Sequence, residues 1–502
     1  MTGRLRRAVA ARPALLGVVG AVLLLAGGSW YQAFVTPPYR FIDEQAHAGY
    51  VLELQHGRLP SIDTPIDAAA GGGALQERLA MEPERRRDVW VANNPPLTYL
   101  LAVGPSALTR ALGVPGGPLV GLRLLNVAAT AGAVVLAYLL ARDLAGGDPT
   151  VGLVGAGIVA AMPHLGFVAA LGFNDGTSLL ATTAVALALA RLAGAGPGPL
   201  DGVRAARWLG LAAAGAALCR PMALVYAGAA VLLGAAITWW RRQAPLPIAA
   251  AWLAGPTAVS AGWWYALSWA RYGDPTGSDA LFEKFDRQPG APLPEILTTR
   301  GIWESNLRTI ATRRLEAPLP GDPYLWYQLA LWVLVVGVAG AAVLVVRSAV
   351  RHRGGRSAAP GRAPALPGTA WAASAALATV PLVLVAQHRA GGGTIHPRYL
   401  FPMLAPVSAA IALTTVRLLT RWAGAALVAV LALATWRQTR ASADWLADHP
   451  TGPLGSVLVG PIGPDLLRVA GLVAAVAGLA LLLAAIAVST GGRGRPTTVA
   501  PS

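Results

Sequence analysis

Long apolar runs, separated by short arginine-rich segments, constrain this chain more than any other feature. A transmembrane helix needs about 20 predominantly apolar residues, and runs of this kind recur along the whole chain and cover nearly half of the 502 residues. Only 13% of the residues are charged, whereas soluble domains carry about 25%. A soluble core could not bury this much apolar surface, so we predict an all-α integral membrane protein. The predicted crossings are 13–35, 119–141, 151–172, 176–195, 221–240, 247–270, 324–346, 368–387, 399–416 and 466–488, with shorter ones at 206–219 and 422–436.

The distribution of arginine predicts the orientation of these helices. The formal net charge is +16, and Lys284 is the only lysine. In a soluble protein this excess would indicate nucleic acid, but here the arginines lie between apolar runs, which is typical of cytoplasmic loops. No nucleic-acid partner is therefore expected. The basic segments are Arg4–Arg7, Arg204–Arg207, Arg241–Arg242, Arg347–Arg362, Arg417–Arg421 and Arg493–Arg495.

Placing every basic segment in the cytoplasm requires about twelve crossings with both termini inside. Segment 97–113 then stays on the outer surface as a short interfacial helix. The predicted organisation is a catalytic transmembrane module at 1–346 with outer loops 36–118 and 271–323, a flexible basic cytoplasmic linker at 347–367, C-terminal transmembrane helices at 368–490, and a disordered cytoplasmic tail at 491–502.

The first outer loop begins with an acidic pair, Asp43 and Glu44, followed by His47. If this segment is helical, Asp43 and His47 share one face because they are four residues apart. Two carboxylates at a membrane surface are suited to take a proton from a hydroxyl or to hold a divalent metal. From these residues alone, an ordinary solvated helix end is the favoured interpretation.

Two later outer turns carry further polar residues. Asn174 and Asp175 interrupt two apolar runs, and Asp175 either caps the next helix or faces the mouth of the bundle. Arg220 and Pro221 interrupt another apolar stretch. The Arg220 guanidinium there could bind phosphate through two hydrogen bonds, or simply extend to the membrane interface.

A short outer loop near residue 390 contains His388, Arg389, His396 and Arg398. Arginines on the outer face violate the positive-inside bias, so they need a reason. An anionic ligand such as a lipid phosphate supplies one, and pairing with outer carboxylates such as Asp43 is the alternative. The chain has one cysteine, Cys219, which excludes an intrachain disulfide and a cysteine-based metal site.

Taken in order, these segments resemble the C-type (GT-C) membrane glycosyltransferase superfamily, which includes family 39-like protein O-mannosyltransferases, aminoarabinose transferases and many bacterial members. The resemblance covers about residues 1–420. One departure is Asn94, which stands where a lysine or histidine often precedes the Pro-Pro-Leu element. The matching motifs are Asp43-Glu44, the Pro-Pro-Leu-x-Tyr element ending at Tyr99, Arg123-Leu124, Phe173-Asn174-Asp175, Arg220-Pro221 and Arg398-Tyr399.

The resemblance implies inverting transfer of a sugar from a polyprenyl-phosphate donor to an acceptor hydroxyl on a glycan, lipid or protein, at the outer face of the cytoplasmic membrane. Whether a divalent metal participates stays open, with Glu44 and Asp175 as its candidate ligands. Two other functions stay open: a transporter or flippase of a lipid-linked or anionic substrate, and a non-catalytic protein of envelope assembly. The implied roles are catalytic for Asp43, Glu44 and Asp175, donor-phosphate binding for Arg398, Arg220 and Arg40, and substrate-lining for His47, Tyr99, Asn174, His396 and Tyr399.

Overall fold

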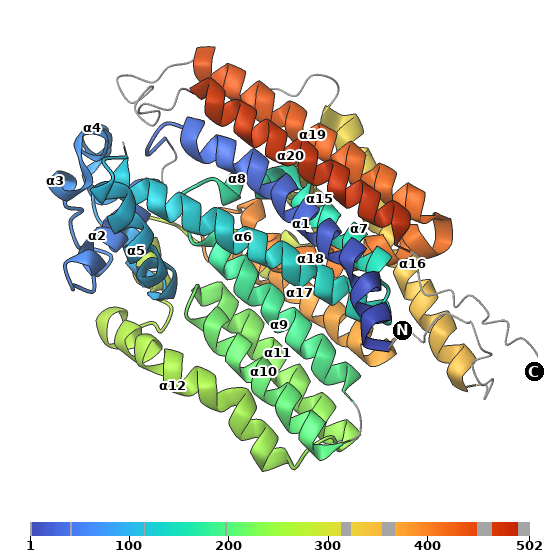
Figure 1. Ribbon diagram of the computed structural model, residues 1–502. Coiled ribbons are helices and arrows are strands. Elements are labelled where there is room, and N and C mark those ends of the chain that lie inside the picture. The colour runs from blue at the N-terminus through green and yellow to red at the C-terminus, as the bar shows by residue number, and fades with distance from the viewer. Residues whose placement is uncertain are drawn as a thin grey trace, which may run out of the picture.

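The computed structural model describes residues 3–40, 43–114, 116–195, 198–312, 323–353, 367–448 and 464–489. Within these ranges the regular structure is helical apart from one isolated bridge between Pro65 and Asp88. Long helices form a bundle, and the small helices of the first outer loop gather at one end of it (Figure 1). The prediction of an all-α fold is confirmed.

Helices occur at all twelve predicted crossings. Two crossings are divided: α7 (Pro149–Ala160) and α8 (Pro163–Ala169) meet at a bend of 64°, and η3 (Pro397–Met403) leads into α18 (Leu404–Thr414) and η4 (Thr415–Leu419). The other ten are α1 (Gly3–Val35), α6 (Gly117–Leu144), α9 (Asp175–Gly194), α10 (Pro199–Ala217), α11 (Pro221–Arg241), α12 (Leu246–Tyr272), α16 (Pro323–Arg353), α17 (Gly368–Ala390), α19 (Arg421–Asp448) and α20 (Pro464–Val488).

Eight helices in the described ranges are long and apolar enough to cross a membrane, or nine if α7 and α8 form one span. Helices α10, α12 and α19 are not among them, so the count of twelve stays a prediction. Large apolar side chains face outward on the bundle, as lipid contact requires; Leu232 is 73% exposed and Val259 83%. The chain is a multi-pass membrane protein.

Shorter helices build the layer outside the bundle. Helix α5 (Leu97–Ala111) has 15 residues and is about 22 Å long, which is less than the roughly 30 Å hydrocarbon core of a bilayer. This length agrees with its predicted place on the surface. The other short helices are α2 (Glu44–Gln55), α3 (Ala68–Gly71), α4 (Gly73–Met81), η1 (Glu84–Arg86), η2 (Trp90–Asn93), α13 (Ser278–Lys284), α14 (Leu293–Thr298) and α15 (Arg300–Thr312).

The two long outer segments pack against each other. The single lysine, Lys284, donates hydrogen bonds of 2.7 Å to both Asp63 and Asp88. The Ile62 backbone N–H donates to the Tyr272 hydroxyl at 3.2 Å. These contacts hold the end of α12 and helix α13 against the first outer loop.

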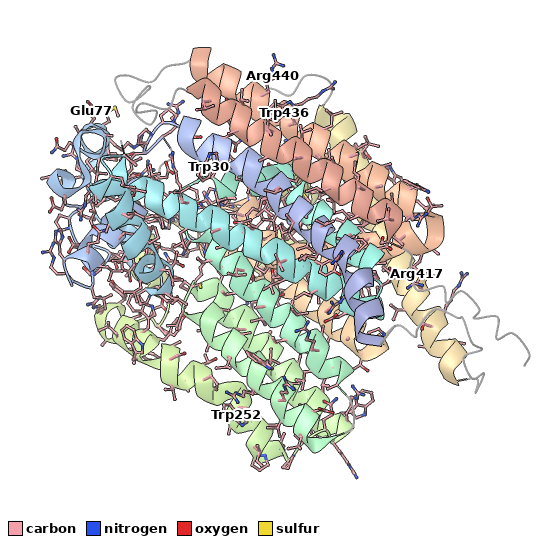
Figure 2. The ribbon with its side chains drawn as sticks, viewed as in Figure 1. Trp30, Glu77, Trp252, Arg417, Trp436 and Arg440 are labelled. Carbon is pink, nitrogen blue, oxygen red and sulfur yellow. The ribbon has the colours of Figure 1, made fainter. Side chains whose placement is uncertain are left out.

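The arginine-bearing helix ends meet at the opposite end of the bundle. Arg191 at the end of α9 pairs with Asp143 at the end of α6, at 2.9 Å, and Arg417 pairs with Asp148 at 3.0 Å. Arg417 and the N-terminus both lie far from Glu77 of the outer layer (Figures 1 and 2). The bundle therefore has one arginine-rich end and one end covered by the outer segments.

The first and last long helices pack very closely. A Cβ atom added to Gly27 would lie 2.5 Å from the carbonyl oxygen of Gly471, and one on Gly20 would lie 2.6 Å from that of Gly478. Small residues at such contacts let helix backbones approach within a membrane. Helices α1 and α20 therefore run side by side (Figure 1).

The predicted linker at 347–367 begins as helix, because α16 continues to Arg353. Residues 354–366 and the predicted tail at 491–502 lie outside the described residues.

Candidate functional site

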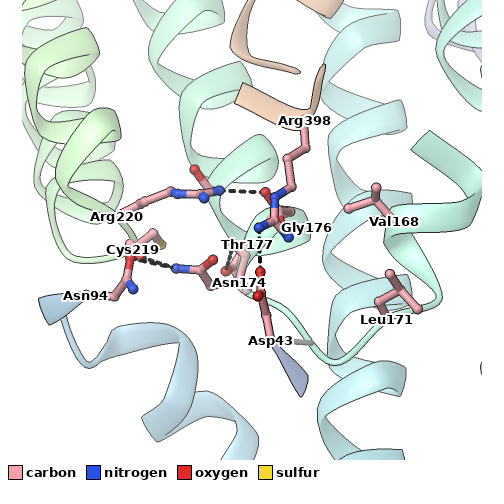
Figure 3. A network of polar contacts seen from close by, with 12 residues as sticks. Asp43, Asn94, Val168, Leu171, Asn174, Gly176, Thr177, Cys219, Arg220 and Arg398 are labelled. Atoms are coloured by element: carbon pink, nitrogen blue, oxygen red, sulfur yellow. Dashed lines mark hydrogen bonds and ion pairs between the residues drawn. The ribbon is translucent and has the colours of Figure 1, made fainter. Parts of the chain in front are cut away.

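Four charged side chains from four separate elements meet at the covered end of the bundle (Figure 3). Arg398 Nη2 donates to Asp43 Oδ2 at 2.6 Å, and its Nη1 lies 3.5 Å from Asp175 Oδ2. Arg220 Nη1 donates to Asp175 Oδ1 at 2.5 Å. Two acids predicted to be catalytic and two arginines predicted to bind phosphate are therefore in direct contact.

Local sequence explains how each charge reaches this place. Pro221 and Pro397 start α11 and η3, as proline does readily because its missing N–H is not needed in a first turn. Arg220 and Arg398 thus lie at helix starts at the covered end of the bundle. Asp175 is the first residue of α9, where a negative charge is favoured by the helix dipole.

The prediction that Asp175 either caps α9 or faces the bundle mouth now has an answer. Asn174 is the N-cap residue of α9 and makes no side-chain capping bond. The Asp175 carboxylate instead contacts Arg220 and Arg398, and its side chain is 2% exposed. Asp175 therefore belongs to the charged site.

The site is electrically balanced, with two carboxylates and two guanidinium groups. Asp43 keeps 21% of its side chain exposed. Burial acts to raise the pKa of Asp43, but the adjacent Arg398 guanidinium outweighs this and the pKa is lowered. The Arg398 Nε atom is buried without a hydrogen-bond partner. The ionised Asp43 carboxylate and the unused Nε donor of Arg398 therefore lie next to each other.

Aromatic rings support both guanidinium groups. Arg220 lies 5.0 Å from the centroid of the Tyr399 ring, and Arg398 lies 4.7 Å from that of Phe173. Such cation–π contacts hold a guanidinium in place without neutralising it. The His396 ring meets Tyr399 edge-on at 5.5 Å, so both of these predicted lining residues are at the site.

Two histidines border the site as neutral rings. Nδ1 of His47 and the Tyr99 hydroxyl form a hydrogen bond of 2.9 Å. Burial lowers the pKa of His47 to about 3 and that of His396 to about 4. Both imidazoles are uncharged near neutral pH, so they can exchange hydrogen bonds with hydroxyl groups and do not attract an anion.

Asn174 connects the site to the Pro-Pro-Leu element. Its Nδ2 donates to Asn94 Oδ1 at 3.1 Å and to the Cys219 carbonyl at 3.3 Å, as Figure 3 shows. The start of α5, the start of α9 and the end of α10 are thereby joined. Asn94 holds this junction at the position where the resembled family often has a basic residue.

Glu44, which was predicted to be catalytic, lies in the core and makes no described contact with the four charges. Its two carboxylate oxygens accept from Nε and Nη2 of Arg123 at 2.8 and 2.7 Å, and both side chains are 0% exposed. Oε1 also accepts from the Gly172 N–H at 2.9 Å. Consecutive helical residues project about 100° apart, so Asp43 reaches the site while Glu44 enters the core.

A divalent metal held by Glu44 and Asp175 does not fit this arrangement. The Glu44 carboxylate is paired with Arg123, and the Asp175 carboxylate is paired with Arg220. The described ranges contain no group of three or more histidine, cysteine or acidic residues able to hold an ion.

Arg40 and Asn126 lie outside the group of four charges. Arg40 lies three residues before Asp43 and is half-buried, and its role in binding phosphate stays a prediction. Sequence reasoning missed Asn126, whose buried amide holds the turn that carries Asp175. A lone asparagine inside an apolar helix was the available signal.

Comparison of the chain with known proteins finds solved structures of low sequence identity. No protein-family model and no curated protein matches the chain. ArnT from Cupriavidus metallidurans bound to undecaprenyl phosphate is 13% identical, with a TM-score of 0.47 over 97% of this chain and 78% of that one. The apo oligosaccharyltransferase of Archaeoglobus fulgidus is 13% identical, with a TM-score of 0.44 over 91% of this chain and 60% of that one.

Proposed function

We propose that this protein transfers a sugar from a polyprenyl-phosphate donor to a hydroxyl group of a glycan, lipid or protein, with inversion at the anomeric carbon. The observation that carries the proposal is the contact of Arg398 with both Asp43 and Asp175. A carboxylate base and a pair of arginines then share one place at the end of a membrane bundle, where a lipid phosphate and a polar acceptor can meet.

The arginines supply the phosphate-binding half of the reaction. Guanidinium groups bind phosphate oxygens through paired, charge-assisted hydrogen bonds. Arg398 has an unused Nε donor, and Arg220 is fixed over the Tyr399 ring. Donors held in advance stabilise charge that develops on a leaving phosphate without having to reorganise.

Asp43 supplies the base. Its lowered pKa keeps it ionised, so it can accept the acceptor's hydroxyl proton as that oxygen attacks the anomeric carbon. The bond between this carbon and the phosphate oxygen breaks, and the electron pair leaves with the polyprenyl phosphate. Attack from the face opposite the phosphate inverts the configuration. His47 and His396, both neutral, can orient hydroxyl groups of the sugar or acceptor.

The arginine-rich helix ends support an outer-face site. They lie at the end of the bundle away from the four charges, and basic ends normally stay in the cytoplasm. We therefore place both termini in the cytoplasm and the site outside the cytoplasmic membrane, where lipid-linked sugars and envelope acceptors are accessible.

The proposal is tested with purified protein in liposomes that contain polyprenyl phosphates carrying radiolabelled mannose, glucose or arabinose, plus an envelope extract as acceptor. We expect wild type to move label from lipid to acceptor, and Asp43→Asn to lower the rate by about 10³-fold, since both proton transfer and the pairing with Arg398 are lost. Asp279→Asn, an exposed carboxylate on α13, is the matched control and should retain the wild-type rate.

Three outcomes would overturn the proposal. Label that crosses the bilayer while remaining attached to the lipid would identify a transporter or flippase. Equal transfer by wild type and Asp43→Asn would remove the base, and absence of transfer with any donor would favour a non-catalytic envelope protein.

A further inference from the structure

One turn of α6 anchors both chain segments that carry the acids of the site. Arg123 and Asn126 are three residues apart, so they lie on one face of the helix. Both are buried, with 0% and 1% exposure. Neither makes a described contact with the four charges of the site, and each instead holds a segment next to one of the acids.

Asn126 holds the turn before Asp175. Its Nδ2 donates to the carbonyl oxygens of Val168 and Leu171 at 2.8 and 2.9 Å, and its Oδ1 accepts from the Gly176 N–H at 2.5 Å. Figure 3 shows Val168, Leu171 and Gly176 around the site. One amide side chain therefore clamps the backbone on both sides of the turn.

The fit at Gly176 is too tight for any other residue. A Cβ atom there would lie 2.3 Å from Asn126 Oδ1 and 2.5 Å from the Asn126 carbonyl oxygen. Gly176 follows Asp175 directly. The close approach of α6 to the Gly176 backbone therefore fixes the position of the Asp175 backbone, from which the carboxylate side chain extends.

Arg123 holds the segment that carries Asp43. Besides Glu44, it donates to the carbonyl oxygens of Ala33 and Thr36 at 2.9 and 2.7 Å. The Gly172 N–H donates to the same Glu44 carboxylate. The two anchored segments are thus tied to each other as well as to α6.

We propose that Asn126 is a positioning residue for Asp175, and that with Arg123 it makes α6 the common reference that sets the separation of Asp43 and Asp175. This inference rests on the proposed function. A displacement of about 1 Å in a reacting geometry can cost about 10²-fold in rate, and residues 170–174 have no helix of their own to hold Asp175. The separation of the Asp43 and Asp175 carboxylates then depends on the hydrogen bonds that the Asn126 amide makes.

The test compares Asn126→Ala and Asn126→Asp with wild type in the transfer assay. Asn126→Asp keeps an oxygen for the Gly176 N–H but replaces the Nδ2 donor by an oxygen that faces the Val168 and Leu171 carbonyls. Asn126→Ala loses all three hydrogen bonds but brings no second oxygen next to those carbonyls. We expect kcat to fall about 10²-fold with the donor KM changed less than about twofold. The control is Thr182→Val, whose buried hydroxyl bonds only within α9 and whose loss should leave kcat unchanged.

A second comparison separates positioning from a purely structural role. If Asn126 acts through Asp175, adding Asn126→Asp to Asp175→Asn should reduce the rate of folded enzyme no further. Effects that multiply in the double variant, or an unchanged kcat in both single Asn126 variants, would overturn the inference.

Failure of the proposed function gives a different pattern. In that case wild type would transfer no sugar, or Asp43→Asn and Asp175→Asn would transfer it as fast as wild type, whatever Asn126 does. If both acid variants are impaired while Asn126→Asp is not, only the positioning role fails.

Discussion

Asp43 and Arg398 are joined by a hydrogen bond of 2.6 Å although 355 residues separate them in sequence. One precedes α2 in the first outer loop, and the other lies in η3, beyond the predicted linker. The site therefore needs both the 1–346 module and the C-terminal helices. The predicted domain division places Asp43 and Arg398 in different parts of the chain, whereas the proposed chemistry requires both residues in one site.

Replacing Glu44 should affect folding more than chemistry. Glu44→Gln leaves the Arg123 guanidinium buried beside a neutral group, and breaking a buried ion pair costs about 3–5 kcal/mol. We expect a marked loss of folded protein and a lower midpoint in thermal unfolding, measured by size-exclusion chromatography in detergent. The folded fraction should keep most of its activity.

The control for Glu44 is Asp286→Asn. Asp286 pairs with Arg85 on the exposed outer surface, where ion pairs contribute little, so the unfolding midpoint should hardly move. A Glu44→Gln protein with wild-type stability and no transfer activity would instead return Glu44 to the catalytic group.

Acidification should destabilise the protein before Asp43 is protonated. His47 and His396 have pKa values of about 3 and 4 in the folded protein, below the ordinary histidine value of about 6.5. Between roughly pH 6.5 and 4 the unfolded chain therefore binds protons that the folded protein does not, and stability falls as pH decreases. The lowered pKa of Asp43 means that its own stabilising contribution is lost only at still lower pH.

Thermal unfolding at a series of pH values measures this effect. We expect His47→Gln to flatten the decline between pH 6.5 and 4, because one of the buried histidines no longer titrates. His56→Gln, a substitution at an exposed histidine, is the matched control. Equal slopes in wild type and His47→Gln would contradict the assignment of a neutral buried imidazole.

Adjacent glycines in α1 should differ sharply in their tolerance of alanine. A Cβ on Gly27 would meet backbone atoms of α20 at 2.5 and 2.6 Å, whereas one on Gly28 meets nothing within 4 Å. Overpacking of this kind costs about 1–3 kcal/mol, so Gly27→Ala should lower the unfolding midpoint. Gly28→Ala is the matched control and should retain it; equal behaviour would show that α1 and α20 are not packed this closely.

Labelling of single cysteines in intact cells tests the orientation. Cys219 is buried, so background reaction with a membrane-impermeant maleimide should be low. We expect Asp279→Cys, on the outer layer, to be labelled from outside, and Arg204→Cys, in α10, to react only after the membrane is opened. The reverse pattern would place the site in the cytoplasm.

Much of the architecture could be predicted from local sequence. Apolar length marked the long helices, and the parity of the arginine clusters predicted α5 on the surface, because a full crossing at Leu97–Ala111 would have reversed the later loops. The site residues could be found because Asp175 and Arg220 interrupt apolar runs, while Asp43 follows the first predicted helix and Arg398 lies in a short polar loop.

Side-chain direction and long-range pairing could not be predicted in this way. Asp43 and Glu44 are chemically alike and adjacent, and only the position of Arg123 in the folded bundle decides which of them is buried. The same holds for Asn126, whose partners lie 42 to 50 residues away. Hydropathy indicates whether such residues are buried, but it does not indicate which residues they contact.

A structure of the protein with bound polyprenyl phosphate tests the central claim most directly. We predict phosphate oxygens about 2.7–3.0 Å from the guanidinium groups of Arg398 and Arg220, with the Asp43 carboxylate beside them and the lipid tail running along the bundle. A phosphate bound at the arginine-rich end near Arg417, or elsewhere away from Asp43 and Asp175, would contradict the account.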